Sequence, residues 1–273
     1  MTVIGIMTIP LSKNTNLKVN YKHLFKSYLP SGYVKWLEQS GAKVVPIPFN
    51  WSTRKINNAL SQVNGVLFPG GSVDRDTHEN FKKYVTCFKQ IFNYAVSENN
   101  NGSTFPLWGT CLGFEFLNLM IYDIDTIVTN YVVGNKSLIL NIVSGRHQNV
   151  KFNLKSNSKL PGKVKLIKNA TIYMNHTYGI LTDKKTMEIL KPYIHVISTN
   201  KDKNNKKYIL TIKYKKYPFW GTQWHPEKSA YEFNDSHIDH NIKNIEFSRN
   251  WSDFFVYECS KNKNKLTKQD LLI

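Results

Sequence analysis

Short apolar runs alternate along the chain with segments whose apolar residues recur at helical spacing. The apolar runs predict strands at residues 3–7, 43–47, 65–68 and 105–108. The helical spacing predicts helices at residues 33–40, 53–63, 76–97 and 116–121. Strands and helices that alternate in this order form a mostly parallel sheet with helices on both of its faces.

The pattern changes in the second half of the chain. Three β-rich segments lie closer together than parallel pairing through helices allows, at residues 137–143, 194–198 and 208–214. We therefore expect an antiparallel extension of the sheet, followed by a last helix over residues 246–259. The pattern predicts a polar loop over residues 97–104 and a single α/β domain over residues 1–260. The lysine-rich tail, residues 261–273, is expected to be flexible.

One cysteine occupies a position typical of a nucleophile. Cys111 lies between Gly109 and Gly113, where a predicted strand gives way to a predicted helix. A sharp strand-to-helix turn with this glycine spacing lifts the central side chain into a cleft. In an open α/β sheet, ligands bind beyond the carboxyl ends of the strands, which is where this turn is expected.

A histidine and a carboxylate follow far downstream, in the run Gln223-Trp224-His225-Pro226-Glu227. Residues two apart on an extended strand point to the same face, so His225 and Glu227 are expected to lie together. Each motif alone is common, because a buried cysteine is usually an inert apolar side chain. Together, Cys111, His225 and Glu227 supply the parts of an activated thiolate nucleophile.

The regions around these motifs carry a family resemblance. Residues 33–46, 64–74, 108–115 and 220–232 together resemble the class I glutamine amidotransferase superfamily, and the likeness runs from about residue 3 to about residue 258. Within the superfamily, the chain is most similar to the γ-glutamyl hydrolases. Glu115 stands where the glutaminases usually have Gln, and Trp224 stands where they commonly have Phe, and both residues are the hydrolase form.

The resemblance implies a flavodoxin-like fold and a cysteine-dependent hydrolase acting on folylpoly-γ-glutamates or other poly-γ-glutamyl substrates. It implies Cys111 as nucleophile, His225 as general base and Glu227 as the acid that orients the imidazole. The N–H of Leu112, directly after the nucleophile, is expected as one oxyanion donor from the geometry of the turn. The resemblance adds the N–H of Gly71 as the second.

Three further residues are candidates for substrate binding. His176 stands where the hydrolases have a second histidine near the substrate, and the alternative is a histidine of an ordinary loop. Glu115 either supports the site, binds the substrate's α-amino group, or is a helix carboxylate bonded to nearby loops. Arg75, after the glycine turn, is placed to meet the α-carboxylate of the glutamate, but the sequence does not decide this.

Composition narrows the partners. The net charge is +18, from 37 Lys and Arg against 19 Asp and Glu. The lysines are scattered among asparagines without a nucleic-acid-binding motif, so no nucleic-acid partner is expected. The charge either reflects a solvated surface or steers a polyanionic substrate toward the cleft. Cysteines and histidines lack zinc-site spacing, so we expect no metal, and no motif calls for a cofactor.

The resemblance also bears on location and assembly. The hydrolase family is lysosomal, vacuolar or secreted and forms homodimers. The first residues read as a core strand rather than a signal peptide, which leaves a cytoplasmic location open. No run of 18 apolar residues is present, so no membrane association is expected. Two other functions stay open: an amidotransferase domain that passes ammonia to a partner, and a catalytically silent homologue that acts as a binding or secreted factor.

Overall fold

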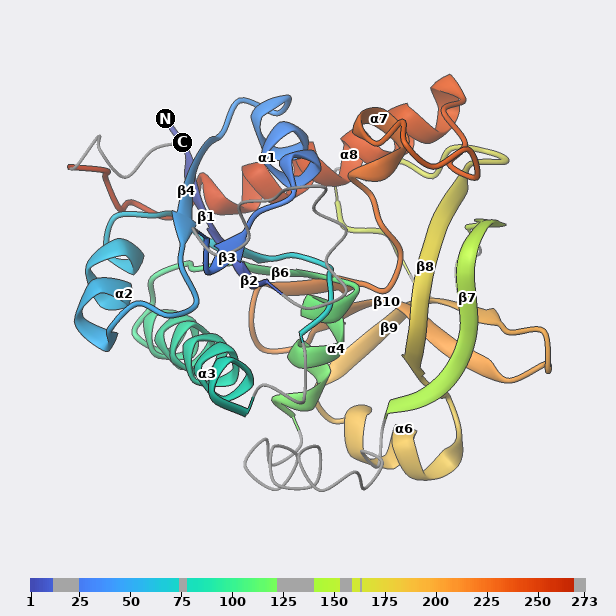
Figure 1. Ribbon diagram of the computed structural model, residues 1–273, viewed down its shortest axis with the longest axis horizontal. Helices are drawn as coiled ribbons and strands as arrows, with labels where there is room; N and C mark the ends of the chain where they lie inside the picture. Colours follow the sequence, from blue (N-terminus) through green and yellow to red (C-terminus); the bar gives the residue numbers. More distant parts are fainter. Residues whose placement is uncertain (12–24, 74–77, 122–139, 153–158, 163, 268–273) are drawn as a thin grey trace.

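A seven-stranded sheet forms the centre of the protein (Figure 1). The computed structural model describes residues 1–11, 25–73, 78–121, 140–152, 159–162 and 164–267. The strand order is β4 (Lys43–Ile47), β1 (Val3–Met7), β5 (Val66–Phe68), β6 (Leu107–Thr110), β11 (Phe219–Thr222), β10 (Lys207–Tyr214) and β9 (Ile194–Lys201). Neighbouring strands from β4 to β11 are parallel, and β10 and β9 extend the sheet in antiparallel pairing. The expected fold class is confirmed.

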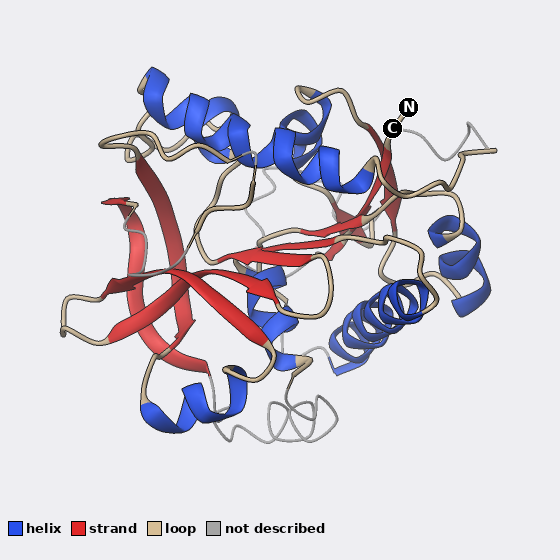
Figure 2. Cartoon of the chain, turned by 180° about the vertical axis from the view of Figure 1, so that it is seen from behind, coloured by secondary structure: helices blue, strands red, loops and turns tan. Residues whose placement is uncertain are grey.

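Helices cover both faces of the sheet (Figures 1 and 2). One face carries α1 (Ser31–Glu38) and α8 (Ile242–Cys259), and the other carries α2 (Thr53–Leu60), α3 (His78–Asn100) and α4 (Leu112–Leu119). On the first face, the ring of Trp108 lies 5.4 Å from that of Trp36 and 5.8 Å from that of Trp251. On the second face, Phe68 of β5 stacks on Phe88 of α3 at 3.8 Å. These aromatic contacts on the two faces of the sheet hold the helices in position relative to the ends of the strands.

A separate hairpin stands beside the sheet, drawn in yellow and yellow-green in Figure 1. It pairs β7 (Leu140–Lys151) with β8 (Thr171–Ile180) in antiparallel register. The sequence predicts a strand at residues 137–143 within the main sheet and no strand at β8. The structure differs because β7 finds its partner in β8, whose apolar positions are interrupted by Asn175 and His176.

Four short elements complete the described part of the chain: β2 (Ile9–Pro10), β3 (Ser27–Tyr28), α6 (Lys184–Leu190) and α7 (Lys228–Tyr231). Helix α3 also runs three residues beyond its predicted end, into the expected polar loop. There the Asn99 side chain donates to the carbonyls of Ala95, at 2.6 Å, and Phe105, at 2.9 Å, and Gly102 turns the chain at φ +86°. These contacts end the helix at Asn100, a polar residue, and the spacing of apolar residues does not predict an end there.

Residues 261–267 of the lysine-rich tail lie against the domain, and residues 268–273 lie outside the described residues. Asn262 is buried and donates to the carbonyl of Thr104 at 2.8 Å. Asn264 donates to the carbonyl of Val63 at 3.0 Å, and Asn64 donates to the carbonyl of Asn264 at 2.9 Å. Asparagine side chains thus anchor this segment. Within the described ranges, no helix is long and apolar enough to cross a bilayer.

Candidate active site

Cys111 occupies a strained turn between β6 and α4. Its backbone has φ +51° and ψ −104°, a combination that non-glycine residues rarely adopt and that costs about 1–3 kcal/mol. The turn is held by the Cys111 N–H, which donates to the carbonyl of Thr222 in β11 at 2.8 Å. The strand before Cys111 and the helix after it are both buried, so the surrounding packing determines the turn.

The two flanking glycines allow the turn because there is no room for a side chain at either. A Cβ on Gly109 would lie 2.6 Å from the carbonyl oxygen of Gly113. A Cβ on Gly113 would lie 2.3 Å from the carbonyl oxygen of Phe68, at the end of β5. The glycine spacing seen in the sequence therefore reflects the close contact of α4 with two strand ends.

His225 and Glu227 form a buried hydrogen-bonded pair. His225 Nδ1 lies 2.8 Å from Glu227 Oε1, and both side chains are less than a tenth exposed. The sequence predicts that both residues lie on an extended strand, and this prediction is wrong. Strand β11 ends at Thr222, and Glu227 has helical backbone angles ahead of α7. The pair forms through the turn instead. The N–H of His225 donates to the carbonyl of Tyr173 in β8 at 3.1 Å.

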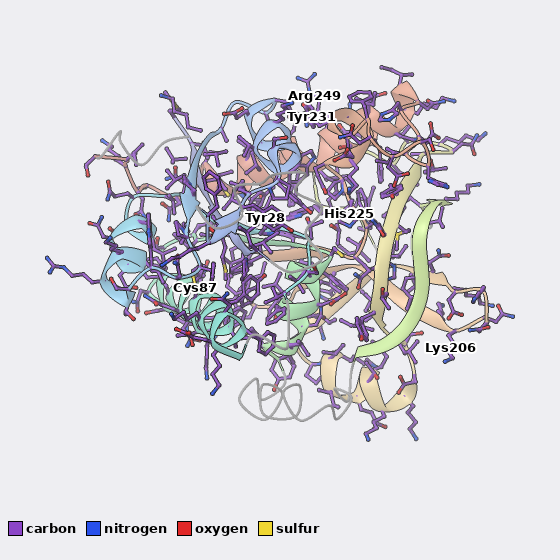
Figure 3. The ribbon with its side chains drawn as sticks, in the orientation of Figure 1. Tyr28, Cys87, Lys206, His225, Tyr231 and Arg249 are labelled. Carbon is purple, nitrogen blue, oxygen red and sulfur yellow. The ribbon has the colours of Figure 1, made fainter. Side chains whose placement is uncertain are left out.

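Gly70 lies between the cysteine and this pair. A Cβ on Gly70 would lie 3.0 Å from Cys111 Cβ, 2.8 Å from His225 Cε1 and 2.7 Å from the hydroxyl of Tyr33. The glycine turn therefore touches all three groups, and Gly71 follows directly. Figure 3 shows His225 in the middle of the molecule, between α1 and β8. The structure brings Cys111, His225, Glu227 and the glycine turn together.

The electrostatics of Cys111 favour the neutral thiol at rest. Burial raises the pKa of Cys111 well above its usual value, and the carboxylates of Glu115 and Glu227 act in the same direction. The N–H of Leu112 and the charge of Lys228 oppose this rise in the pKa. The position of the cysteine at the start of a helix favours the thiolate, but burial outweighs it. Formation of the thiolate therefore requires a base beside it.

Glu227 remains ionised in spite of its burial. Burial raises the pKa of Glu227, but His225 and Lys228 outweigh this and hold the pKa of the carboxyl below its usual value. An ionised Glu227 accepts the proton on His225 Nδ1. The other ring nitrogen, Nε2, is buried and has no hydrogen-bond partner among the described residues. That nitrogen is the one left to take a proton from a neighbour.

His176 lies on β8 with its ring buried near the same place. Its Nδ1 lies 2.7 Å from the carbonyl oxygen of Tyr178, which fixes the proton on Nδ1. Its Nε2 is buried and has no hydrogen-bond partner among the described residues. Burial lowers the pKa of His176 to about 4, so the ring is neutral near pH 7. The carbonyl of the preceding Asn175 lies 3.9 Å from Cys111 Sγ, which places β8 beside the thiol.

The remaining candidates differ in what the structure says of them. Gln223 donates to Glu115 Oε1 at 3.2 Å, so this helix carboxylate is bonded to the loop that carries His225. The N–H of Leu112 interacts with the Cys111 sulfur. Gly71 directly follows Gly70. Arg75 lies outside the described residues.

Sequence reasoning missed Tyr33 as part of the site. Its hydroxyl accepts from the N–H of Gly70 at 2.8 Å and lies 3.4 Å from His225 Nδ1. Tyr33 belongs to the apolar face of α1, and it is fully packed there. Its sequence position gives no signal of a partner 192 residues away.

Comparisons with known proteins agree with this geometry. The peptidase C26 family model matches residues 2–227. The chain is 34% identical to γ-glutamyl hydrolase B of Dictyostelium discoideum, covering 99% of this chain and 75% of that protein. It is 33% identical to human γ-glutamyl hydrolase, covering 88% of this chain and 74% of that protein.

A solved structure is similar in fold. The crystal structure of a putative GMP synthase subunit from Thermoplasma acidophilum matches with a TM-score of 0.55 at 14% identity, over 95% of this chain and 94% of that one. At this identity the likeness concerns the fold alone. The family match spans both the cysteine turn and the His225–Glu227 pair, and on that ground this chain belongs to the peptidase C26 family.

Proposed function

We propose that this protein hydrolyses the γ-glutamyl bonds of folylpoly-γ-glutamates and related poly-γ-glutamyl conjugates, with Cys111 as nucleophile. One observation carries the proposal: Glu227 orients His225 through Nδ1, the unpartnered Nε2 is buried, and Cε1 of the ring lies against the glycine turn that also touches Cys111. The relatives named above are γ-glutamyl hydrolases, which supports the substrate class.

The first step forms a thioester. His225 Nε2 takes the proton of the Cys111 thiol, and the sulfur attacks the γ-carbonyl carbon of a glutamyl residue. Glu227 stabilises the imidazolium that results. The carbonyl oxygen becomes an oxyanion, for which we assign the N–H groups of Leu112 and Gly71 as donors. Loss of one such donor costs about 3 kcal/mol of transition-state stabilisation in other enzymes.

The second step releases both products. The tetrahedral intermediate collapses, the C–N bond breaks, and His225 returns its proton to the leaving α-amine. A water molecule then gives a proton to His225 and attacks the thioester carbon. The C–S bond breaks, the departing sulfur takes the proton back from His225, and the γ-carboxyl group is released and ionises in solvent. The reaction consumes one water and needs no cofactor.

Two buried groups are proposed to hold the scissile glutamate. His176 presents an unpartnered Nε2 that is neutral at pH 7 and accepts a hydrogen bond from a substrate N–H. Glu115, whose charge acts on the Cys111 thiol, and its partner Gln223 form the second polar group. Arg75 stays a proposal from the sequence, as a partner for the α-carboxylate.

The family resemblance supports two further proposals. We infer a homodimer, tested by light scattering on the purified protein. We also infer a lysosomal, vacuolar or secreted location, tested by following the tagged protein in cells. A monomer at all concentrations, or a purely cytosolic protein, would contradict the respective proposal.

The function is tested by incubating the protein with pteroyl-penta-γ-glutamate and following the products by mass. The matched control is Cys111→Ala, checked for folding by circular dichroism. Loss of glutamates with the wild type alone supports both the reaction and its nucleophile. The ladder of products also shows whether cleavage starts at the end of the chain or within it.

Glutamine is offered in a separate reaction, because the fold also occurs in glutaminases. Ammonia from glutamine without cleavage of the pteroyl compound supports the amidotransferase function instead. No turnover of either substrate by folded protein supports a catalytically silent homologue.

A further inference from the structure

The hydroxyl of Tyr33 joins two parts of the site that come from distant segments. It accepts the N–H of Gly70 at 2.8 Å, on the glycine turn, and lies 3.4 Å from His225 Nδ1, in the histidine–glutamate pair. The side chain is 2% exposed, so water does not compete for these contacts. Gly32, the residue before it, is also close to the pair, because a Cβ there would lie 3.3 Å from Glu227 Cγ.

Counting protons shows what the hydroxyl does. A hydroxyl has one proton to donate, and Tyr33 uses its oxygen as acceptor for Gly70. His225 Nδ1 carries a proton and donates a hydrogen bond to Glu227 Oε1 at 2.8 Å. A protonated Nδ1 cannot accept a hydrogen bond from the Tyr33 hydroxyl. The Tyr33 proton is left for the Glu227 carboxylate, whose charge acts on the Tyr33 hydroxyl and whose Oε2 has no hydrogen-bond partner among the described residues.

The state of Tyr33 agrees with a donor role. Burial raises the pKa of Tyr33 well above its usual value, and the charge of Glu227 raises it further, as does the Cys111 thiolate when it forms. The phenol is therefore neutral over the whole working range of pH. It neither accepts the proton of Cys111 nor carries charge in the reaction, so it acts through its neighbours.

We propose that Tyr33 is a positioning residue of this site, which ties the Gly70–Gly71 turn to the Glu227–His225 pair through one buried hydroxyl. The proposal deepens the function given above and rests on it. Its consequence is that the expected oxyanion donor and the base are set by the same contact. A shift of either relative to Cys111 by about 1 Å lowers the rate by about a hundredfold in other enzymes.

Tyr33→Phe removes the hydroxyl and keeps the ring. We expect kcat on pteroyl-di-γ-glutamate to fall about tenfold to a hundredfold, with KM changed less than threefold, because the contact orients reacting groups rather than substrate. The charged form of Glu227 loses the hydroxyl that faces it, so the Glu227 carboxylate takes up a proton at higher pH. The acidic limb of kcat/KM therefore moves to higher pH.

The control is Tyr214→Phe. Tyr214 is a buried tyrosine of β10 whose hydroxyl donates to the carbonyl of Leu117, on α4, away from the pair. It loses a buried hydrogen bond of the same kind, and its pH profile and kcat are expected to match the wild type. The other ionisable groups near the contact are unchanged in both variants: Cys111, Glu115, Tyr173, His176 and Lys228.

A second variant keeps the hydroxyl and strengthens it as a donor. Difluorotyrosine incorporated at position 33 has a more acidic phenol than tyrosine and the same shape. It stabilises the charged form of Glu227, so the acidic limb is expected to move to lower pH. This opposite sign distinguishes positioning from a general effect on folding, and it remains measurable if Tyr33→Phe fails to fold.

The alkylation rate of Cys111 by iodoacetamide, followed by mass against pH, gives a readout that needs no γ-glutamyl substrate. We expect its acidic limb to shift as that of kcat/KM does, upward in Tyr33→Phe and downward in the difluorotyrosine protein. Wild type that alkylates normally but cleaves no substrate would refute the proposed function and leave the positioning test intact. Profiles that coincide in all four proteins would overturn the proposal, as would a lower kcat without any shift in pH.

Discussion

A Cβ atom on Gly113 would lie 2.3 Å from the carbonyl oxygen of Phe68. The start of α4 therefore rests directly on the end of β5, and this contact sets the height of the cysteine turn above the sheet. The backbone of Cys111 keeps its unusual angles because the chain on both sides of it is immobilised by such contacts.

Gly113→Ala is expected to destabilise the protein by about 2–3 kcal/mol, because the main chain of β5 or α4 has to move to admit the methyl group. Urea unfolding measures the loss, and kcat is expected to fall with it. Gly162→Ala is the control, since a Cβ at Gly162 meets nothing within 4 Å. It should stay within about 0.5 kcal/mol of the wild type. Equal stability of the two variants would contradict the packing argument.

Glu227→Gln replaces the charge opposite His225 and keeps the shape of the side chain. We expect kcat to fall by about two to four orders of magnitude, because the imidazolium formed during the reaction loses its counter-charge and the ring its fixed tautomer. Steady-state kinetics on a γ-glutamyl substrate measures the change. Glu232→Gln, at the end of α7, is the matched control, and its kcat should match that of the wild type. A similar loss in both variants would show that the effect is not specific to the pair.

His176 should make the protein less stable in acid. Its pKa is about 4 when folded, against about 6.5 when unfolded, so between these values the unfolded chain binds a proton that the folded chain does not. Stability is complete above about pH 6.5 and falls as the pH drops toward 4, by about 3 kcal/mol in total.

Urea unfolding at several pH values checks this for the wild type and for His176→Gln. The variant should show a smaller loss of stability between pH 6.5 and 4. His237→Gln, whose side chain is 61% exposed, should keep the full loss. The argument fails if the three proteins lose stability in parallel.

Asn262→Ala should lower stability without lowering activity. The buried amide is bonded to the carbonyl of Thr104, at 2.8 Å, and its loss leaves that carbonyl unsatisfied. A cost of about 1–3 kcal/mol is typical of such a loss. Thermal unfolding measures the cost and kcat provides the comparison. An unchanged melting temperature would mean that water replaces the amide.

Salt should slow the cleavage of long substrates more than that of short ones. The chain carries a net charge of +18, and each added glutamate adds a negative charge to the substrate. Attraction between them raises the rate of encounter and is screened over about 10 Å at 0.1 M salt. The value of kcat/KM for the pentaglutamate should fall more steeply with NaCl than that for the diglutamate. If kcat/KM falls equally with NaCl for both substrates, the positive charge of the protein does not steer the substrate.

Local pattern predicts the parallel half of the fold well. Strands β1 and β4 have the bounds expected from their apolar runs, and Cys111 lies at the predicted strand-to-helix turn. These elements are defined by periodicity within a few residues. The motif spacing likewise marks His225 and Glu227, although the pair is formed by a turn rather than a strand.

What the sequence does not predict depends on contacts between distant segments. Strand β8 contains polar residues that read as a loop until β7 pairs with it. In the sequence, Tyr33 looks like one more residue of a buried helix face. Its role in the site depends on the contacts of its hydroxyl with Gly70 and His225. In the sequence, Asn262 and Asn264 look like residues of a solvated tail. In the structure, their side chains donate hydrogen bonds to carbonyls of the main domain.

The contacts of the Cys111 turn determine when the site can form during synthesis of the chain. The cysteine appears early in the growing chain, but the carbonyl that holds its N–H belongs to Thr222, and the proposed base is His225. Until those residues leave the ribosome and β11 joins the sheet, the thiol has neither its turn nor its base. The nascent chain therefore carries an ordinary, slowly reacting cysteine, and hydrolytic activity arises only when the last strand of the sheet is in place.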